Sequence, residues 1–325
     1  MLLDLYITHW NEPWEIVQPG MEILKLQRSA DWNEIRVTIV HDGSKAFPDE
    51  YFEGYPFQVL QAEIQHGGIA AARNWCIDHG DAEWIKWNDC DDMFLGIYSL
   101  FDMTNAMRVA KQIDMLWFDV RARLLDGSVY DKKDLDPVLI HGKAFRRSFL
   151  KDHGIRFQED LTWCEDSAFM SLVLMEIGDN RIAHIDATST IYAWICREGS
   201  LCNRPEIKFA NLKSFFRRHC YVQEEMKKHG QMYEYYSMTV RVLGDSYFTL
   251  KRAGIDPAEE GYAEHREAVR KYYLEHAADL TKIKSDRLKW VIQTVNEENP
   301  GCDLDTETLF RFLRELKGGP GDVYS

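Results

Sequence analysis

The sequence predicts an α/β protein in which a mostly parallel sheet fills the first two thirds of the chain and a helical region follows. Up to about residue 203, short apolar runs alternate with helix-like segments, and polar clusters follow several of these runs. After residue 204, apolar residues recur at steps of three and four. We therefore expect two domains, covering residues 1–203 and 204–325.

Apolar runs of strand length mark the expected strands, which are residues 2–8, 35–40, 57–62, 83–87 and 113–120. Helix-like segments lie between them, at residues 14–27, 67–77 and 168–175. Strands that alternate with helices form mostly parallel sheets covered on both faces. Ligands bind beyond the carboxyl ends of such strands, so we expect the polar clusters there to form the functional site.

The second region carries one clear helical stripe, formed by Tyr236, Val240, Leu243, Tyr247 and Leu250. Further helices are expected at residues 206–228, 262–278, 281–296 and 305–317. We expect this helical domain to shape the side of the site that faces a second substrate, or to mediate self-association.

The net charge of −14 lies entirely in residues 1–203, which hold 33 acidic and 19 basic residues. This acidity argues against a protein that coats nucleic acid. Seven cysteines without a tight spacing pattern indicate reduced thiols and a cytoplasmic protein. The N-terminal run is expected to be a strand rather than a signal peptide, and no apolar stretch has the length of a membrane span. If the protein acts at a membrane, we therefore expect it to bind the membrane surface peripherally.

Three carboxylates crowd the turn Asp89-Cys90-Asp91-Asp92, directly after an expected strand. Such carboxylates repel one another unless a positive charge lies among them. Mg²⁺ or Mn²⁺ takes carboxylate oxygens and completes its shell with substrate phosphates. Taken alone, the turn could also be an ordinary acidic surface turn.

Small residues open the helix at Gly67-Gly68, and Arg73 follows them. This start permits close backbone approach, and Arg73 could pair with a phosphate. A well-packed helix with a surface arginine is the alternative. The Gly-x-Gly-x-x-Gly pattern of nicotinamide dinucleotide folds is missing after the first strand.

Two weaker signals lie further along the chain. Asp166, which follows Glu165, could cap the helix at 168–175 or serve as a general base. Arg197, with the turn Gly199-Ser200, could hold a diphosphate or belong to an ordinary strand exit.

Taken in order along residues 3 to about 203, these elements resemble the family 2 glycosyltransferases, which have the GT-A fold. The matching segments are Thr8-His9-Trp10-Asn11, Asp42-Gly43-Ser44, Ala72-Arg73-Asn74, Asp89 to Asp92, Gly142 to Arg147, Gly154 to Phe157 with Glu165-Asp166, and Tyr192 to Ser200. Two positions depart from the family pattern: His41 replaces the first Asp of the Asp-Asp-Gly-Ser turn, and Trp10 replaces the usual Tyr.

For the donor, the resemblance implies a nucleotide-sugar, with uridine as the expected base. Trp10 would stack on that base, Asp42 would accept a base N–H, and Thr8 and Asn11 would line the same pocket. The diphosphate would meet Arg73.

Arg197 would help Arg73 to hold the diphosphate. The resemblance also places Asp89 near the ribose or the metal and makes Asp91 the main protein ligand of Mn²⁺ or Mg²⁺. Asp166 would deprotonate the acceptor hydroxyl while Glu165 orients the acceptor, and one-step displacement would invert the stereochemistry.

The acceptor stays open among a glycan or other surface polymer, a lipid-linked sugar and a hydroxylated base in nucleic acid. Six basic residues on the expected helix 206–228 could receive an anionic acceptor or form a solvated face; they are Lys208, Lys213, Arg217, Arg218, Lys227 and Lys228. Two other classes remain as alternatives. A nucleotidyltransferase would carry a Gly-rich loop where this chain reads HWNEPW, and a non-catalytic nucleotide-sugar binder would not need Asp91 and Asp166.

Overall fold

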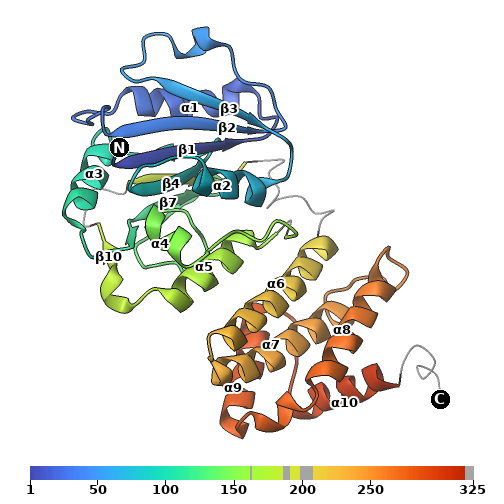
Figure 1. The fold of residues 1–325 in the computed structure, drawn as a ribbon. Helices are drawn as coiled ribbons and strands as arrows, with labels where there is room; N and C mark the ends of the chain where they lie inside the picture. Colours follow the sequence, from blue (N-terminus) through green and yellow to red (C-terminus); the bar gives the residue numbers. More distant parts are fainter. Residues whose placement is uncertain (162, 186–190, 198–207, 319–325) are drawn as a thin grey trace. The chain divides into compact units, whose positions relative to one another are not determined.

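The computed structural model describes residues 1–161, 163–185, 191–197 and 208–318 (Figure 1). The chain divides into two compact units, Met1–Arg204 and Pro205–Ser325. Among the described residues, no helix is long and apolar enough to span a membrane.

The first unit is built on a seven-stranded sheet with the strand order β10-β6-β9-β4-β1-β2-β3. Its strands are β1 (Leu3–His9), β2 (Ile35–Asp42), β3 (Val59–Ile64), β4 (Trp84–Asp89), β6 (Met115–Trp117), β9 (Lys143–Arg146) and β10 (Ile182–His184). Neighbouring strands are parallel except at β9, which runs antiparallel to both β4 and β6. The expected mostly parallel sheet is therefore confirmed.

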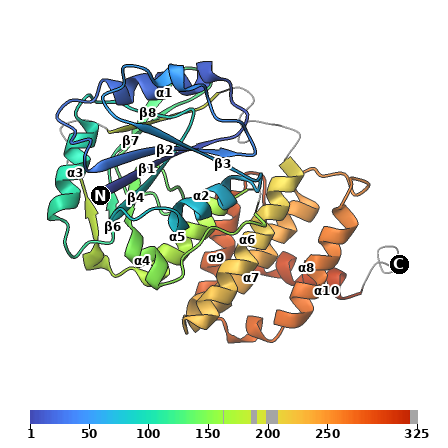
Figure 2. The same cartoon turned by 45° about the horizontal axis from the view of Figure 1, so that its top comes forward.

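Helices lie on both faces of this sheet: α1 (Trp14–Lys25), α2 (Ile69–Asp78), α3 (Ser99–Val109), α4 (Arg147–Asp152) and α5 (Glu165–Glu176). Figures 1 and 2 show α1 and α2 on opposite sides of β1 and β2. The alternation of side chains along β1 explains this arrangement. Leu3, Leu5 and Ile7 join the core that includes α1 and α3, whereas the Tyr6 ring packs edge-on against Trp75 of α2. Short 3-10 turns occur at Asp49–Phe52 and Asp179–Arg181.

A second sheet has four strands in the order β5-β11-β7-β8. Its strands are β5 (Met93–Phe94), β7 (Val120–Arg123), β8 (Val129–Lys132) and β11 (Tyr192–Ile195). The single strand expected at residues 113–120 is wrong, because the chain leaves the main sheet after Trp117 and enters the second sheet at Val120. The Phe118 amide donates to the carbonyl of Gly142, at 2.9 Å, just before this exit.

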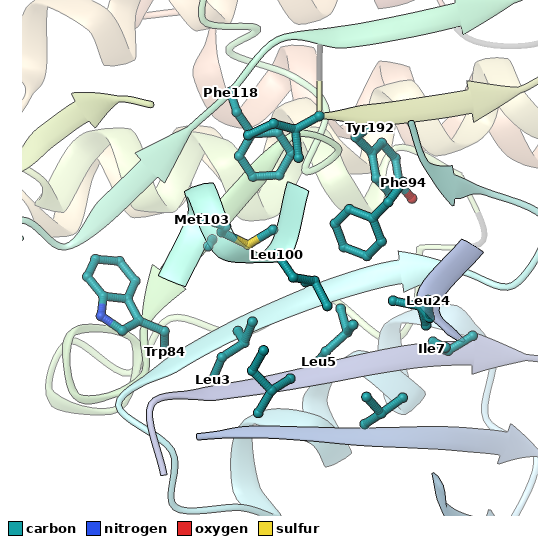
Figure 3. Packing of buried hydrophobic residues seen from close by; sticks show 14 of the residues in the cluster. Leu3, Leu5, Ile7, Leu24, Trp84, Phe94, Leu100, Met103, Phe118 and Tyr192 are labelled. Carbon is teal, nitrogen blue, oxygen red and sulfur yellow. The ribbon is translucent and has the colours of Figure 1, made fainter. Parts of the chain in front are cut away.

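The buried core of this unit joins the two sheets (Figure 3). Phe94 of β5 meets Tyr192 of β11 edge to face, with ring centres 6.0 Å apart, while Leu5 and Trp84 contribute from the main sheet. The second sheet is thereby fixed against the carboxyl end of β4, where the acidic turn begins.

The strand register brings the sequence motifs together. Thr8 pairs with Asp89, and His9 pairs with His41, so the ends of β1, β2 and β4 lie at one edge of the sheet. Three segments that are up to 81 residues apart in the sequence thus supply side chains to one place.

The second unit contains only helices in its described part: α6 (Lys208–Lys228), α7 (Met232–Lys251), α8 (Tyr262–His276), α9 (Ser285–Glu298) and α10 (Thr306–Lys317), with a 3-10 turn at Asp279–Lys282. Four members of the expected stripe, Val240, Leu243, Tyr247 and Leu250, are buried in its core. Figure 2 shows α6 and α7 side by side. Asp305 caps α10 by accepting a hydrogen bond from the Thr308 amide.

Candidate active site

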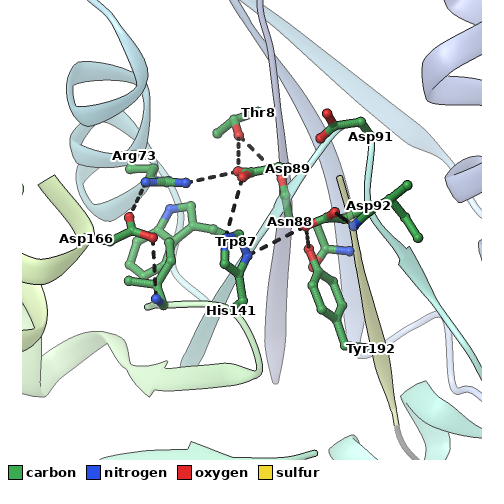
Figure 4. A network of polar contacts seen from close by, with 12 residues as sticks. Thr8, Arg73, Trp87, Asn88, Asp89, Asp91, Asp92, His141, Asp166 and Tyr192 are labelled. Atoms are coloured by element: carbon green, nitrogen blue, oxygen red, sulfur yellow. Dashed lines mark hydrogen bonds and ion pairs between the residues drawn. The ribbon is translucent and has the colours of Figure 1, made fainter. Parts of the chain in front are cut away.

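The three carboxylates of the acidic turn have different partners, and Figure 4 shows the contacts of Asp89 and Asp92. Asp89, the last residue of β4, accepts hydrogen bonds from Thr8 Oγ1 at 3.3 Å and from Arg73 Nη2 at 3.0 Å. Asp91 forms an ion pair with Arg197, with 2.6 Å between Oδ2 and Nε. The carboxylates of Asp89 and Asp91 therefore contact different side chains.

Asp92 is the buried member of the turn. Its Oδ2 accepts a hydrogen bond from the Tyr192 hydroxyl at 2.7 Å, and its Oδ1 accepts one from the Ile195 amide at 2.9 Å. Both donors come from β11, so Asp92 anchors the acidic turn to the second sheet. Close by, the Lys86 amine lies 4.2 Å from the centre of the Tyr192 ring, and burial lowers the pKa of this lysine to about 7.

Burial and mutual repulsion set the charges of the turn. Burial would raise the pKa of Asp89, but the positive charge of Arg73 holds it below its ordinary value. Burial and the charge of Asp89 raise the pKa of Asp91, and burial with both neighbouring carboxylates raises that of Asp92 well above its usual range. The turn thus has an excess of negative charge that a cation would relieve.

Arg73 joins the acidic turn to α5. Its side chain is 2% exposed, and its guanidinium reaches Asp89, Glu165 Oε1 at 3.0 Å and Asp166 Oδ1 at 2.5 Å. The helix α2 starts with small residues at the sheet edge, which brings Arg73 close to the end of β4. A single buried cation therefore holds three carboxylates from two distant segments.

His141 is a member of the site that the sequence did not single out. Its Nε2 lies 3.9 Å from Asp89 Oδ2 and its Nδ1 lies 3.6 Å from Asp92 Oδ2. Ligand atoms of these three residues lie within 4.8 Å of one another, which suits a divalent cation. Burial lowers the pKa of His141 and so favours the neutral, ligating form. The one available signal was its place directly before Gly142-Lys143.

Glu165 and Asp166 begin α5. The helix starts at Glu165 with Cys164 in the N-cap position, so Asp166 lies in the first turn and the expected helix-capping role of Asp166 is wrong. Cys164 has a left-handed backbone with φ of 69°, unusual for a residue other than glycine. Burial and the neighbouring Asp166 raise the pKa of Glu165 to about 7.

The carboxylate of Asp42 is occupied by backbone amides. It accepts hydrogen bonds from Gly67 N at 2.7 Å, from Gly68 N at 2.9 Å and from His66 Nδ1 at 2.9 Å. Asp42 thus fixes the chain that leads into α2. The Trp10 ring stacks on His66 with ring centres 5.2 Å apart and an angle of 13° between the planes.

Asn11 lies beside Trp10 with a positive φ of 60°, and its amide donates to Ser44 Oγ at 2.7 Å. This contact links the loop after β1 to the loop after β2. Trp10 remains 43% exposed at this position and has indole surface free of the protein core. An aromatic ring held at a sheet edge in this way can receive a planar ligand.

Behind Trp10 lies a buried pair of histidines. His9 Nδ1 is 2.9 Å from His41 Nδ1, His9 Nε2 is 2.8 Å from the carbonyl oxygen of Glu12, and His41 Nε2 is 3.1 Å from Gln61 Oε1. Burial and the charge of His9 lower the pKa of His41 to about 4. The residue that departs from the family turn is thus engaged in a closed chain of hydrogen bonds.

Arg197 bridges the acidic turn to the loop after β1, because its Nη2 lies 3.2 Å from Glu12 Oε1 while its Nε binds Asp91. Its side chain is 27% exposed. The expected turn Gly199-Ser200 lies outside the described residues. The predicted site residues thus lie after β1, β2 and β4 and at the start of α5, except Arg73 in α2 and Arg197 after β11. These two arginines connect the acidic turn to α5 and to the loop after β1.

Replacing Trp10 by Ala is expected to raise the KM for a nucleotide donor about tenfold, with kcat changed by less than about twofold. Stacking of a base on an aromatic ring contributes roughly 1–3 kcal/mol, and it is made equally in the ground state and the transition state. Steady-state kinetics would measure this. Trp290→Ala, at a 53% exposed tryptophan of the helical unit, is the matched control. A fall in kcat with KM unchanged would contradict the stacking role.

Comparison with known proteins agrees with the resemblance. Residues 4–123 match the family model described as "Glycosyl transferase family 2". No curated protein sequence matched this chain. The family match spans β1 to β7 and includes Trp10, Asp42, Arg73 and the acidic turn.

Solved structures of TarS from S. aureus share the fold. The segment 1–349 of TarS in complex with UDP-GlcNAc matches with a TM-score of 0.63 and 16% identity, covering 92% of this chain and 89% of that one. The complex of the same segment with UDP gives 0.60 and 15%. The longer TarS structure gives 0.60 and 15%, and the match spans 54% of it. The chain therefore has a GT-A-like fold.

Proposed function

We propose that this chain, a glycosyltransferase with a family 2 domain at residues 4–123, transfers a sugar, with inversion, from a uridine diphosphate sugar to an acceptor hydroxyl. The observation that carries the proposal is the position of Arg73. It connects Asp89 of the acidic turn to Asp166, the candidate base. The buried Arg73 side chain would thus contact both a carboxylate of the donor side and the carboxylate that activates the acceptor.

A divalent cation fits the acidic turn. The pKa values of Asp91 and Asp92 are raised by burial and by neighbouring carboxylates, which is the environment of a site that lacks positive charge. Asp91 and Asp89 are the proposed protein ligands, with His141 within reach of Asp89. When bound, Mn²⁺ or Mg²⁺ would offset the negative charge that builds on the leaving diphosphate.

Arg73 and Arg197 would have different roles at the diphosphate. Arg197 is the more accessible, with 27% of its side chain exposed, against 2% for Arg73. We propose that Arg197 contacts the diphosphate and exchanges its pairing with Asp91 for that contact. Arg73 then does not contact the diphosphate directly. It pairs with Asp89 and keeps this carboxylate ionised.

Asp166 is the proposed general base. Its Oδ1 is bound by Arg73, so Oδ2 is the oxygen that would accept the proton of the acceptor hydroxyl. Oδ2 also lies 3.5 Å from the Ile140 amide, which orients the carboxylate. The same Nη1 atom of Arg73 also donates a hydrogen bond to Glu165 Oε1, and Glu165 would position the acceptor.

Trp10 would stack on the base of the donor, and Thr8, Asn11 and Asp42 would form the walls of its pocket. TarS, which shares the fold, has been solved with UDP and with UDP-GlcNAc, and this supports uridine as the base. The nucleotidyltransferase and the non-catalytic binder are not favoured by the family match.

The acceptor is proposed to be a glycan or another polymer with free hydroxyls. The basic residues of α6 give little support to an anionic landing surface: Lys228 pairs with Glu225, Lys227 lies over the Tyr235 ring, and Lys213 lies over Phe209. The side chain of Lys208 is outside the described residues. A glycosyltransferase acting on hydroxylated bases in nucleic acid stays a second candidate without a specific contact in its favour.

The proposal is tested by nucleotide release from a panel of UDP-, GDP- and dTDP-sugars. With Mn²⁺ we expect slow hydrolysis of one UDP-sugar, lost with chelator and reduced at least about 100-fold in Asp91→Asn, because the charge on the leaving diphosphate is then unrelieved. Asp286→Asn, at an exposed position of α9 in the second unit, is the control. Release that persists in chelator would exclude the metal. No release from any donor, together with no binding of UDP by calorimetry, would exclude the function.

The rate should depend on pH through Glu165. Because burial raises the pKa of this acid to about 7, the carboxylate form that positions the acceptor grows as the pH rises from 6 to 8. We expect kcat/KM to rise over this window and then level off. In Glu165→Gln, kcat/KM should be lower and the rise near pH 7 should vanish. An unchanged pH profile in this variant would assign the titration to another group.

A further inference from the structure

A small cleft opens where the two sheets of the first unit part. The empty space at this cleft is about 370 Å³, and most of it is open to solvent, so a bound ligand would remain partly exposed. Its walls come from β6 and β9 of the main sheet and from β7, β8 and β11 of the second sheet. None of the residues assigned so far to the base, the diphosphate or the proton transfer lines it. His141, which lies near the proposed metal ligand Asp89, does line it.

Two tryptophans form its aromatic walls, Trp117 at the end of β6 and Trp194 in β11. Each is packed against a histidine. The ring of Trp117 lies 4.0 Å from that of His184, and the ring of Trp194 lies nearly parallel to His141, with centres 6.3 Å apart. His184 is in turn bound to Asp119 at 3.0 Å. The close contact with His184 holds the Trp117 indole in place before any ligand arrives, which reduces the entropy cost of binding.

Polar groups complete the rim. Lys132 and Asp136 form an ion pair of 2.7 Å, and Asp136 also accepts the amides of Val138 and Leu139, so this side of the cleft is rigid. Asp134 is exposed and makes no hydrogen bond to any other described residue. A fixed pair and an available carboxylate, placed around aromatic walls, suit a ligand that has an apolar face and a ring of hydroxyls.

The cleft adjoins the proposed chemistry. His141 lines it and also reaches Asp89 and Asp92, as Figure 4 shows. The segment that carries His141 also supplies Ile140, whose amide lies 3.5 Å from Asp166 Oδ2. In the sheet, β4 lies between the two halves of the edge: β1 and β2 carry the base pocket on one side, and β9 and β6 carry the cleft on the other. A donor laid along this edge would have its base at one end and its sugar towards the cleft.

We propose that the cleft bounded by Trp117 and Trp194 binds a sugar ring, whose C–H face packs on the indoles and whose hydroxyls meet Asp134 and Lys132. The proposal rests on the proposed function for its place in the reaction. The ring is either the donor sugar or the terminal sugar of the acceptor, since both present the same chemistry to these walls.

The experiment compares Trp194→Leu, Trp117→Leu and Asp134→Asn with wild type. Calorimetry in the presence of Mn²⁺ gives the affinities for UDP and for a panel of UDP-sugars. Saturation-transfer NMR with methyl glycosides of glucose, galactose and N-acetylglucosamine is run with and without UDP. Unchanged binding of UDP shows that a variant is folded, and Asp134→Asn alters an exposed side chain without disturbing the core. Trp290→Leu controls for loss of an unrelated tryptophan.

If the donor sugar occupies the cleft, the affinity for one UDP-sugar falls about tenfold in the cleft variants and the affinity for UDP changes by less than twofold. If the acceptor sugar occupies it, both affinities hold and saturation transfer to one methyl glycoside is lost. Retention of UDP-sugar binding and of saturation transfer in all three variants, or no saturation transfer even in wild type with equal affinities for UDP and every UDP-sugar, would overturn the proposal. Failure of wild type to bind UDP refutes the proposed function instead, and the NMR without nucleotide still tests the cleft.

Discussion

Asp166→Asn is expected to lower kcat for sugar transfer by about 1,000-fold while the Kd for the nucleotide donor changes by less than about threefold. A positioned base contributes roughly 10²–10⁴-fold, and an amide cannot accept the proton. The donor contacts proposed here do not include Asp166, and asparagine keeps an oxygen that can face Arg73. Rates with saturating donor, and donor binding by calorimetry, would measure the two effects separately.

Asp160→Asn is the matched control, because this aspartate is exposed and precedes the same helix. It should leave both quantities unchanged. Hydrolysis of the donor by water is less dependent on a base than transfer is, so it should fall less than transfer. If Asp166→Asn weakened donor binding as much as it slowed transfer, the carboxylate would belong to the donor site, and the assignment of the base would pass to Glu165.

Arg73→Met is expected to lower the free energy of unfolding by about 3–5 kcal/mol at pH 8 and to abolish transfer. Removing one partner of a buried ion pair leaves uncompensated charge, and here three carboxylates lose their shared cation. The loss should shrink as the pH falls towards 5. Without the arginine, the folded carboxylates hold protons more tightly than the unfolded ones, so stability decreases with rising pH. Denaturant titrations at pH 5 and pH 8 would check this.

Arg156→Met provides the comparison. Arg156 pairs with Asp78 at 2.6 Å on the surface, with side chains 38% and 48% exposed, and such pairs contribute about 0–1 kcal/mol. Mn²⁺ should restore part of the stability lost in Arg73→Met, because it brings a new positive charge to Asp89. Equal losses in the two arginine variants, or a loss independent of pH, would show that Arg73 acts through packing alone.

The sequence was sufficient for the elements whose patterns are local. β1, β2 and β4 follow from short apolar runs, and their parallel register follows from the helices between them. The stripe of α7 predicted a buried helix face, and Val240, Leu243, Tyr247 and Leu250 occupy it. Each of these predictions needs only the neighbours of a residue along the chain.

The parts that were missed depend on contacts between distant segments. The apolar run 113–120 reads as one strand, but the chain changes sheets in the middle of it. β9 is short and antiparallel, and no periodic pattern marks a four-residue strand. His141 enters the site only because the loop before β9 folds over the end of β4. Periodicity along the sequence carries no information about contacts between segments that are distant in the sequence.

Arg73 shows the same limit within the site. The sequence identified it as a cationic residue beside a ligand, and its spacing could not reveal that three carboxylates surround it. Asp42 is similar, since its oxygens face two backbone amides and His66. Motifs therefore located the residues of the site, and the fold decides which of them face one another.

The hydrogen bonds of the His9–His41 pair behind Trp10 determine how many hydrogens the ring nitrogens carry. The carbonyl of Glu12 can only accept, so His9 Nε2 must carry a hydrogen. Gln61 Oε1 already accepts the Phe47 amide, which fixes it as the oxygen, so His41 Nε2 must carry one too. The contact between the two Nδ1 atoms needs a third. Two rings that share three hydrogens carry one positive charge between them.

His41 occupies the position where the family turn has an aspartate, so the substitution replaces a carboxylate beside the base pocket with an imidazole of this pair. Loss of the third hydrogen would set two lone pairs against each other, either between the rings or at the carbonyl of Glu12. One ring would then have to turn. Because the side chain of Glu12 pairs with Arg197, a rotation of the His9 ring would disturb a segment that is linked to the acidic turn.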